Sequence, residues 1–237
     1  MRKYTPILLL WIFALEIVAE ATPVTPRSKE TRDLPEFNSI SLRVSGNVYI
    51  KQGSTQKVEI EGSERSLEEI ETRVVNRRLI IKWEGARSWF GWSNHGRVDI
   101  YITVKDIREL SVGGSGTIQS ESNFNVDDLE LSVSGSGRIE FEADADDVDI
   151  RISGSGRIEL EGSSNDNQIH ISGSGRLYAA DMKARSYDIR ISGSGSCRVN
   201  VSSEIYASIS GSGSVYYRGD PDKVRSNVSG SGSLRRM

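Results

Sequence analysis

Residues 149–162 read DIRISGSGRIELEG, and the phrase SGSG at the centre of this stretch decides the fold. The phrase returns along the chain at intervals of 18 to 21 residues, a period at which each repeat forms one coil of a solenoid. A weaker copy, LRVSGNVYI, begins at Leu42. The GSG triplets begin at Gly114, Gly135, Gly154, Gly173, Gly193, Gly211 and Gly230.

Apolar and polar residues alternate on both sides of SGSG. Ile150 and Ile152 precede the phrase, and Ile158 and Leu160 follow it, all at even positions. A period of two predicts strands with one buried face. Because the phase holds across SGSG, we expect a strand bent at a corner rather than a hairpin loop, with both glycines inside and the serines outside. These corner glycines are Gly135, Gly137, Gly154, Gly156, Gly173, Gly175, Gly193 and Gly195.

The sequence therefore predicts an all-β protein, a β-solenoid that spans residues 37–237. Residues 105–237 hold the regular SGSG coils, and residues 37–104 hold the same strand-like runs with longer excursions. We expect longer and less regular coils over residues 37–104.

The N-terminus has the pattern of an export signal. Two basic residues precede the apolar run 7–15, and Ala19-Glu20-Ala21 is a small-x-small cleavage site. We expect a signal peptide over residues 1–21 and a polar linker over residues 22–36. The apolar run is short for a bilayer, so the cleaved chain is not transmembrane; an uncleaved anchor is the alternative.

Net charge and the few Cys and His residues argue against several classes of function. The net charge of −3 over 237 residues argues against nucleic-acid binding, which requires a basic patch. The lone Cys197 takes the same position in its repeat as Ile158 and Leu177, which predicts a buried small residue rather than a nucleophile or an intermolecular disulfide. His95 and His170 are too far apart in sequence to indicate a metal pair.

Two rows of serines are candidate binding residues. Stacked coils lie about 4.8 Å apart, so serines of successive corners form two parallel ladders that can bind a glycan or a flat surface. The alternative is that small polar residues simply suit a tight corner. No His or Lys recurs beside the rows to activate a serine nucleophile. One ladder holds Ser134, Ser153, Ser172, Ser192, Ser210 and Ser229, and the other includes Ser136, Ser155, Ser174 and Ser194.

Two further groups are candidates. Asp128, Asp147 and Asp166 each stand seven residues before the first glycine of a corner. Such a column can bind Ca²⁺, although Asp is also an ordinary turn residue. The segment EGARSWFGWSNHGR, residues 84–97, concentrates aromatic side chains suited to sugar stacking, to a protein partner, or to covering an open end of the core. Its aromatic residues are Trp89, Phe90 and Trp92.

The run FNSISLRVSGNVYIKQG (residues 37–53), followed by KVEIEGS, LIIKW, ELSVGGSG and the later SGSG copies, resembles the head GIN domain family. These exported bacterial proteins, abundant in Bacteroidetes, are labelled "putative autotransporter adhesins". The resemblance covers residues 35–237. It implies a right-handed parallel β-helix that is secreted or surface-associated, and it brings no catalytic residues.

We therefore expect a non-enzymatic binding or adhesion module of the cell envelope with a glycan or cell-surface partner. The location is periplasmic, on the outer cell surface, or secreted. An architectural or oligomer-forming role and a polysaccharide-active enzyme are the alternatives; an enzyme needs acids and a base that converge in a groove, whereas these acids repeat with the coil. Arg235 and Arg236 near the open end would repel a like end, so a mainly monomeric protein is expected.

Overall fold

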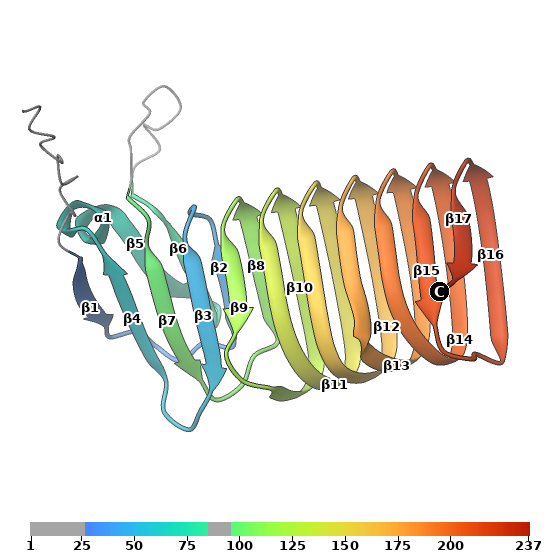
Figure 1. Cartoon of the computed structure of the whole chain (residues 1–237). Helices are drawn as coiled ribbons and strands as arrows, with labels where there is room; N and C mark the ends of the chain where they lie inside the picture. The colour runs from blue at the N-terminus through green and yellow to red at the C-terminus, as the bar shows by residue number, and fades with distance from the viewer. Residues whose placement is uncertain (1–26, 85–95) are drawn as a thin grey trace, which may run out of the picture.

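A computed structural model describes residues 27–84 and 96–237 and shows a chain wound into a parallel β-solenoid of about seven turns (Figure 1). Its strands join in one continuous 17-stranded sheet that folds round a central core. The predicted fold class is confirmed.

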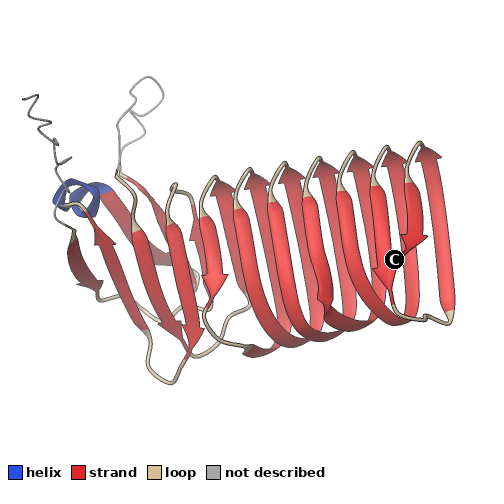
Figure 2. Ribbon diagram, viewed as in Figure 1, coloured by secondary structure: helices blue, strands red, loops and turns tan. Residues whose placement is uncertain are grey.

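Residues 109–237 form the regular coils. Each long strand runs down one face, bends round the lower edge and rises on the other face (Figure 2). Neighbouring coils pair in parallel and in register, so that Ile150, Ile169 and Ile189 lie side by side. The strands are β8 (Glu109–Gly114), β9 (Thr117–Ser120), β10 (Phe124–Gly135), β11 (Arg138–Gly154), β12 (Arg157–Gly173), β13 (Arg176–Gly193), β14 (Ser196–Gly211), β15 (Ser214–Arg218), β16 (Lys223–Gly230) and β17 (Ser233–Arg236).

The SGSG turns form the sharp upper edge of the solenoid. The Ser155 amide donates to the Gly135 carbonyl at 2.9 Å, and the Arg157 amide donates to the Gly137 carbonyl at 3.0 Å. The hydrogen-bond ladder between coils therefore continues through the turn. The two arms of a turn pair with neighbouring coils and not with each other, so the turn is a corner and not a hairpin.

The expectation that both glycines of a corner lie inside is wrong for the first glycine. Gly154 is exposed and has φ of +107°, in the left-handed region that favours glycine. A Cβ at Gly154 would lie 2.8 Å from the Gly135 carbonyl oxygen. Gly156 is buried, and a Cβ there would collide with the Val133 side chain. The first glycine is needed for the reversal of the chain, and the second for close packing on the core.

The core fills the space between the two faces. Val148, Ile150 and Ile158 are at most 2% exposed, and Cys197 is fully buried, as its position in the repeat predicted. Burial raises the pKa of the Cys197 thiol, because the thiolate would lose its hydration. The Tyr187 hydroxyl is also buried, and it has no hydrogen-bond partner among the described residues.

The weak copy of the repeat forms a genuine coil. It consists of β2 (Ser39–Leu42) and β3 (Asn47–Gln52), which pair in parallel with β8 and β9. At its corner the Ser45 and Ser115 hydroxyl oxygens lie 2.9 Å apart.

The coils of residues 37–104 do not follow chain order. The coil of β6 (Arg78–Trp83) and β7 (Asp99–Val104) lies outside the β2–β3 coil, because β2 pairs with β6 and β3 with β7 (Figure 1). Antiparallel strands then cover this end: β4 (Lys57–Gly62) pairs with β7, and β5 (Ile70–Val75) pairs with β6.

A short helix, α1 (Glu64–Glu69), joins β4 to β5. Ser63 caps the N-terminus of this helix, because its side chain accepts a hydrogen bond from the Ser66 amide at 3.2 Å.

The expected linker over residues 22–36 is wrong where the structure describes it. Residues 28–32 form β1 (Ser28–Arg32), which pairs with β4 in antiparallel orientation. Ion pairs support the strand: Arg27 lies 2.6 Å from Asp99, and Lys29 lies 3.3 Å from Glu59. Residues 1–26, which include the predicted signal peptide, lie outside the described residues.

Candidate functional site

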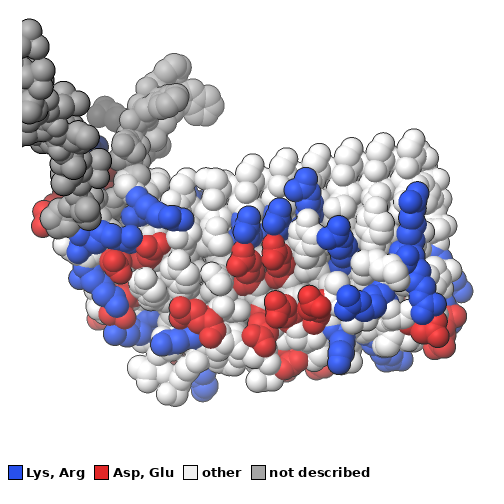
Figure 3. All heavy atoms as spheres, in the orientation of Figure 1, with Lys and Arg blue, Asp and Glu red and all other residues white. Residues whose placement is uncertain are grey.

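In-register stacking turns every outward position of the repeat into a row along the solenoid. Ser134, Ser153 and Ser172 are paired residues of successive coils, and all three are exposed. The predicted ligand residues lie two residues further along the chain, on the same edge, and are also exposed: Ser136, Ser155, Ser174 and Ser194. On the face seen in Figure 3, this upper edge carries no charged side chain.

A groove of about 480 Å³ runs beside the first serine row. One side carries Arg151, His170 and Arg190, which occupy one row of three successive coils. The groove lies over residues such as Ile171, whose side chain points into the core. Its floor is therefore backbone rather than side chain, and it follows the coil spacing. The other side is formed by Ser153, Ser172, Ser192 and Ser210.

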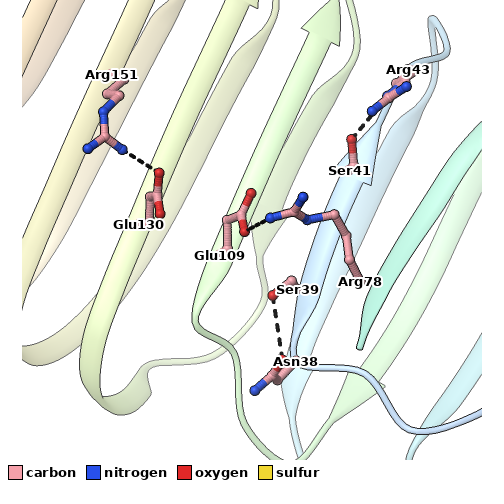
Figure 4. A network of polar contacts seen from close by, with 8 residues as sticks. All are labelled: Asn38, Ser39, Ser41, Arg43, Arg78, Glu109, Glu130 and Arg151. Atoms are coloured by element: carbon pink, nitrogen blue, oxygen red, sulfur yellow. Dashed lines mark hydrogen bonds and ion pairs between the residues drawn. The ribbon is translucent and has the colours of Figure 1, made fainter. Parts of the chain in front are cut away.

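Neighbouring acids fix the arginines of the groove. Arg151 donates to Asp149 at 2.8 Å and also pairs with Glu130 of the preceding coil (Figure 4). Arg190 donates to Asp188 at 2.7 Å, and its other terminal nitrogen lies 3.3 Å from His170 Nε2. The positive charges of Arg151 and Arg190 are thus partly neutralised by Asp149 and Asp188. The groove presents hydroxyls and guanidinium edges rather than a strong net charge.

The same kind of pairing across coils occurs nearer the N-terminal end. Arg78 of β6 pairs with Glu109 of β8, although β2 lies between these strands (Figure 4). The residue of β2 in this row is Ser39, which is small enough for the arginine to reach across.

The acidic column is in register, but its members stand one per coil. In the strand register, Asp128 lies opposite Asp147, Asp147 opposite Asp166, and Asp166 opposite Ser186. Ser186 donates a hydrogen bond to Asp166. Within residues 27–84 and 96–237, no group of three or more His, Cys, Asp or Glu side chains is arranged to hold a metal ion. Calcium binding by this column stays a prediction.

Other carboxylates of the lower bend receive hydrogen bonds from neighbouring coils. Asp144 accepts from Ser163 and, at 2.6 Å, from Asn123. These two bonds lower the pKa of the Asp144 carboxyl. Asn165 donates to Asp146 at 2.8 Å. Hydroxyl and amide side chains of neighbouring coils therefore donate hydrogen bonds to the Asp144 and Asp146 carboxylates.

Trp89, Phe90 and Trp92 lie outside the described residues. Trp83, just before that segment, is partly buried and packs against the core. None of the helices within the described ranges is both long and apolar enough to cross a membrane.

Sequence reasoning missed a second surface feature, the uneven distribution of charge along the solenoid. Residues 105–175 hold 5 Lys and Arg against 15 Asp and Glu, a net charge of −10. Residues 176–237 hold 10 against 5, a net charge of +5. The near-neutral total hides this contrast, which counting by repeat would have revealed. In Figure 3 acidic side chains gather over the middle coils, and basic ones prevail toward the C-terminal end.

Comparison with solved structures supports the fold. A "putative adhesin" from Bacteroides fragilis superposes with a TM-score of 0.82 at 22% identity, covering 91% of this chain and 99% of that one. A "putative lipid binding protein" from Parabacteroides distasonis gives 0.71 at 23% identity, with 89% and 96% covered. A "putative adhesin" from Parabacteroides merdae gives 0.71 at 22% identity, with the same coverage. No curated protein matches the chain.

The family comparison agrees with the fold and with the repeated corner. The model described as "Putative auto-transporter adhesin, head GIN domain" matches residues 36–221, which include the β2–β3 coil and most of the SGSG coils. An adhesin family of this kind indicates an exported protein. With the solenoid, its corners and this match together, the chain belongs to the head GIN domain family of adhesin-like proteins.

Proposed function

We propose that this protein is a non-enzymatic binding or adhesion module of the bacterial envelope, and that it binds an uncharged glycan along the groove beside the serine edge. The observation that carries the proposal is the groove itself. It is built from identical positions of successive coils, with Ser153, Ser172 and Ser192 on one side and Arg151 and Arg190 on the other.

Geometry favours an extended ligand with a repeating unit. Hydroxyls recur at about 4.8 Å along the axis, so one coil after another offers the same hydrogen-bonding groups. The guanidinium groups are already paired with acids and therefore serve as neutralised donors to sugar hydroxyls. Acids of the described surface repeat with the coil instead of converging, which favours binding over hydrolysis.

Export is part of the proposal. Residues 1–21 read as a cleaved signal peptide, which places the mature chain in the periplasm, on the outer surface or outside the cell. The adhesin names of the family and of two structural neighbours are consistent with that placement.

Binding of the mature chain to an array of neutral glycans tests the proposal. The test variant replaces Ser153, Ser172 and Ser192 with Ala, which removes the hydroxyls from the groove. The control variant replaces Ser132, Ser163 and Ser226 with Ala, three serines outside the groove. We expect the first variant to bind about a hundredfold more weakly, because it loses three hydrogen bonds of about 1 kcal/mol each, and the control to bind like the wild type.

Two results would contradict the proposal. One is an equal loss in both variants. The other is wild-type binding to phospholipid vesicles with no binding to any glycan, which would favour a lipid ligand, as the name of the Parabacteroides distasonis neighbour indicates for that protein.

A further inference from the structure

We infer that the C-terminal coils carry a second binding surface, separate from the groove, that recognises the carboxylate or sulfate groups of a linear anionic polysaccharide. Its residues lie on the face of β13, β14, β15 and β17. The anion-binding ladder, as we name it, consists of Arg176, Tyr178, Arg198, Tyr216 and Arg235.

The ladder is set by register. Tyr178, Arg198, Tyr216 and Arg235 occupy one row of four successive coils. They alternate along the strands with buried residues such as Leu177 and Cys197, so their side chains point outward. Aromatic and basic residues thus follow one another along the axis, at about one per 4.8 Å.

The arginines of the ladder lack acidic partners. Among the described residues, no ion pair or side-chain hydrogen bond involves Arg176, Arg198 or Arg235, and all three are exposed. By contrast, the earlier arginines of the same face are paired: Arg138 lies 3.0 Å from Glu140, and Arg157 lies 3.3 Å from Glu159. The unpaired guanidiniums repel one another, and an anionic ligand would relieve that repulsion.

Stacking orients at least one of these guanidiniums. The Arg198 guanidinium carbon lies 5.2 Å from the centre of the Tyr178 ring, and Arg157 covers the same ring at 5.2 Å. A guanidinium held over an aromatic ring is restricted in orientation while its N–H edges stay free. Such edges bind carboxylate and sulfate oxygens in the bidentate manner, which is the strong form of this contact.

The surroundings favour a narrow polysaccharide over a membrane. The row of Arg176 continues with Ser196, Ser214 and Ser233, which border the ladder with hydroxyls suited to sugar hydroxyls. Nearer the N-terminal end, the row of the ladder continues with Glu140 and Glu159. Those acids would repel a broad anionic surface such as a bilayer, whereas a single chain can lie at the C-terminal end alone.

The test measures binding of the full mature chain to polygalacturonate and dextran sulfate, with neutral dextran, anionic phospholipid vesicles and single-stranded DNA as comparison ligands. The ladder variant carries Arg176→Gln, Arg198→Gln and Arg235→Gln. The matched control carries Arg65→Gln, Arg73→Gln and Arg138→Gln, which removes the same charge from paired arginines that lie outside both the ladder and the groove. Urea melts of each variant verify that it is folded.

We expect the wild type to bind one or both anionic polysaccharides and not dextran, with an affinity that falls as salt rises. The ladder variant should bind the anionic polysaccharide at least about tenfold more weakly than the wild type, and the control variant no more than about threefold more weakly. Tyr178→Leu should weaken binding as well, because Arg198 loses its support. An equal loss in ladder and control variants, or preferred binding to vesicles or DNA, overturns the inference. Neither outcome bears on the groove, which is tested with uncharged glycans.

Discussion

Replacement of the first glycine of a corner tests how the SGSG edge is built. Gly154 has φ of +107°, and a Cβ there would lie 2.8 Å from the Gly135 carbonyl oxygen and 3.3 Å from the Gly135 Cα and nitrogen. Gly114 has almost the same φ, +108°, but a Cβ there would meet nothing within 4 Å. The two sites therefore separate backbone strain from the clash between stacked coils.

The magnitudes follow from these contacts. An alanine in the left-handed region costs about 1–2 kcal/mol, so Gly114→Ala should destabilise the protein by that amount alone. Gly154→Ala carries the same strain, and overpacking against the backbone of the preceding coil adds about 1–3 kcal/mol. Gly154→Val should be worse still. Ser155→Val faces solvent and should change stability by about 0.5 kcal/mol or less.

Urea melts followed by circular dichroism measure these differences, provided that the slope of unfolding free energy against urea stays the same in each variant. Equal costs for Gly114→Ala and Gly154→Ala would show that the coils do not stack as tightly as described. A Ser155→Val variant less stable than Gly154→Val would contradict this description of the corner, in which Ser155 faces solvent and Gly154 lies against the Gly135 backbone.

Four further perturbations have definite expected outcomes. Because burial raises its pKa, the Cys197 thiol should resist alkylation at pH 8 in the native protein and react once urea unfolds it; full labelling without urea would contradict its burial. Tyr187→Phe should raise the free energy of unfolding, measured by a urea melt, by up to about 1 kcal/mol, since it removes a buried hydroxyl that has no partner among the described residues. A marked loss of stability would mean that the hydroxyl is hydrogen-bonded. Millimolar calcium should leave the melting temperature unchanged. A rise in melting temperature that disappears when Asp128, Asp147 and Asp166 are all changed to Asn would establish a calcium site. Light scattering should show association when valines replace Arg235 and Arg236, because Val224 and Val228 on β16 are already 46% and 38% exposed and the added valines would enlarge this apolar surface. A variant that stays monomeric would contradict this expectation.

The repeat made most of the solenoid predictable. Alternation alone placed Ile150, Ile158 and Cys197 inside, since an extended strand sends successive side chains to opposite faces. The same rule failed at Gly154, where a positive φ rotates the side-chain direction outward before the alternation resumes at Gly156. Parity describes extended backbone only, and a corner is where the backbone departs from it.

The order in which the coils pair could not be predicted from the sequence. β2 lies between β6 and β8, which are distant from it in sequence, and a repeat period does not state which coil is its neighbour. β1 was missed because SKETR has no apolar residue to mark a strand; its backbone bonds to β4 and its ion pairs fix it instead.

The candidate sites divide in the same manner. The serine rows could be predicted, because each serine holds a fixed position relative to its own glycine. The contacts of an arginine across coils could not be predicted. Arg151 has Asp149 two residues away in sequence, but its second partner, Glu130, belongs to the preceding coil. Arg198 stacks on Tyr178 of the preceding coil and forms no ion pair among the described residues. Register is needed to identify such contacts.

This architecture separates the demands of folding from those of recognition. The inward positions and the corner glycines are constrained by packing, as the collision of any Cβ at Gly156 with Val133 illustrates. The outward positions carry no such constraint. In this chain some rows hold serine, and another changes along the axis from glutamate to tyrosine and arginine. A fold shared at 22–23% identity with its structural neighbours is therefore compatible with different ligands, since the rows can change while the core is kept. Specificity in this family should accordingly be sought row by row, in the pairing of outward residues across coils, and not in the SGSG phrase that builds the edge.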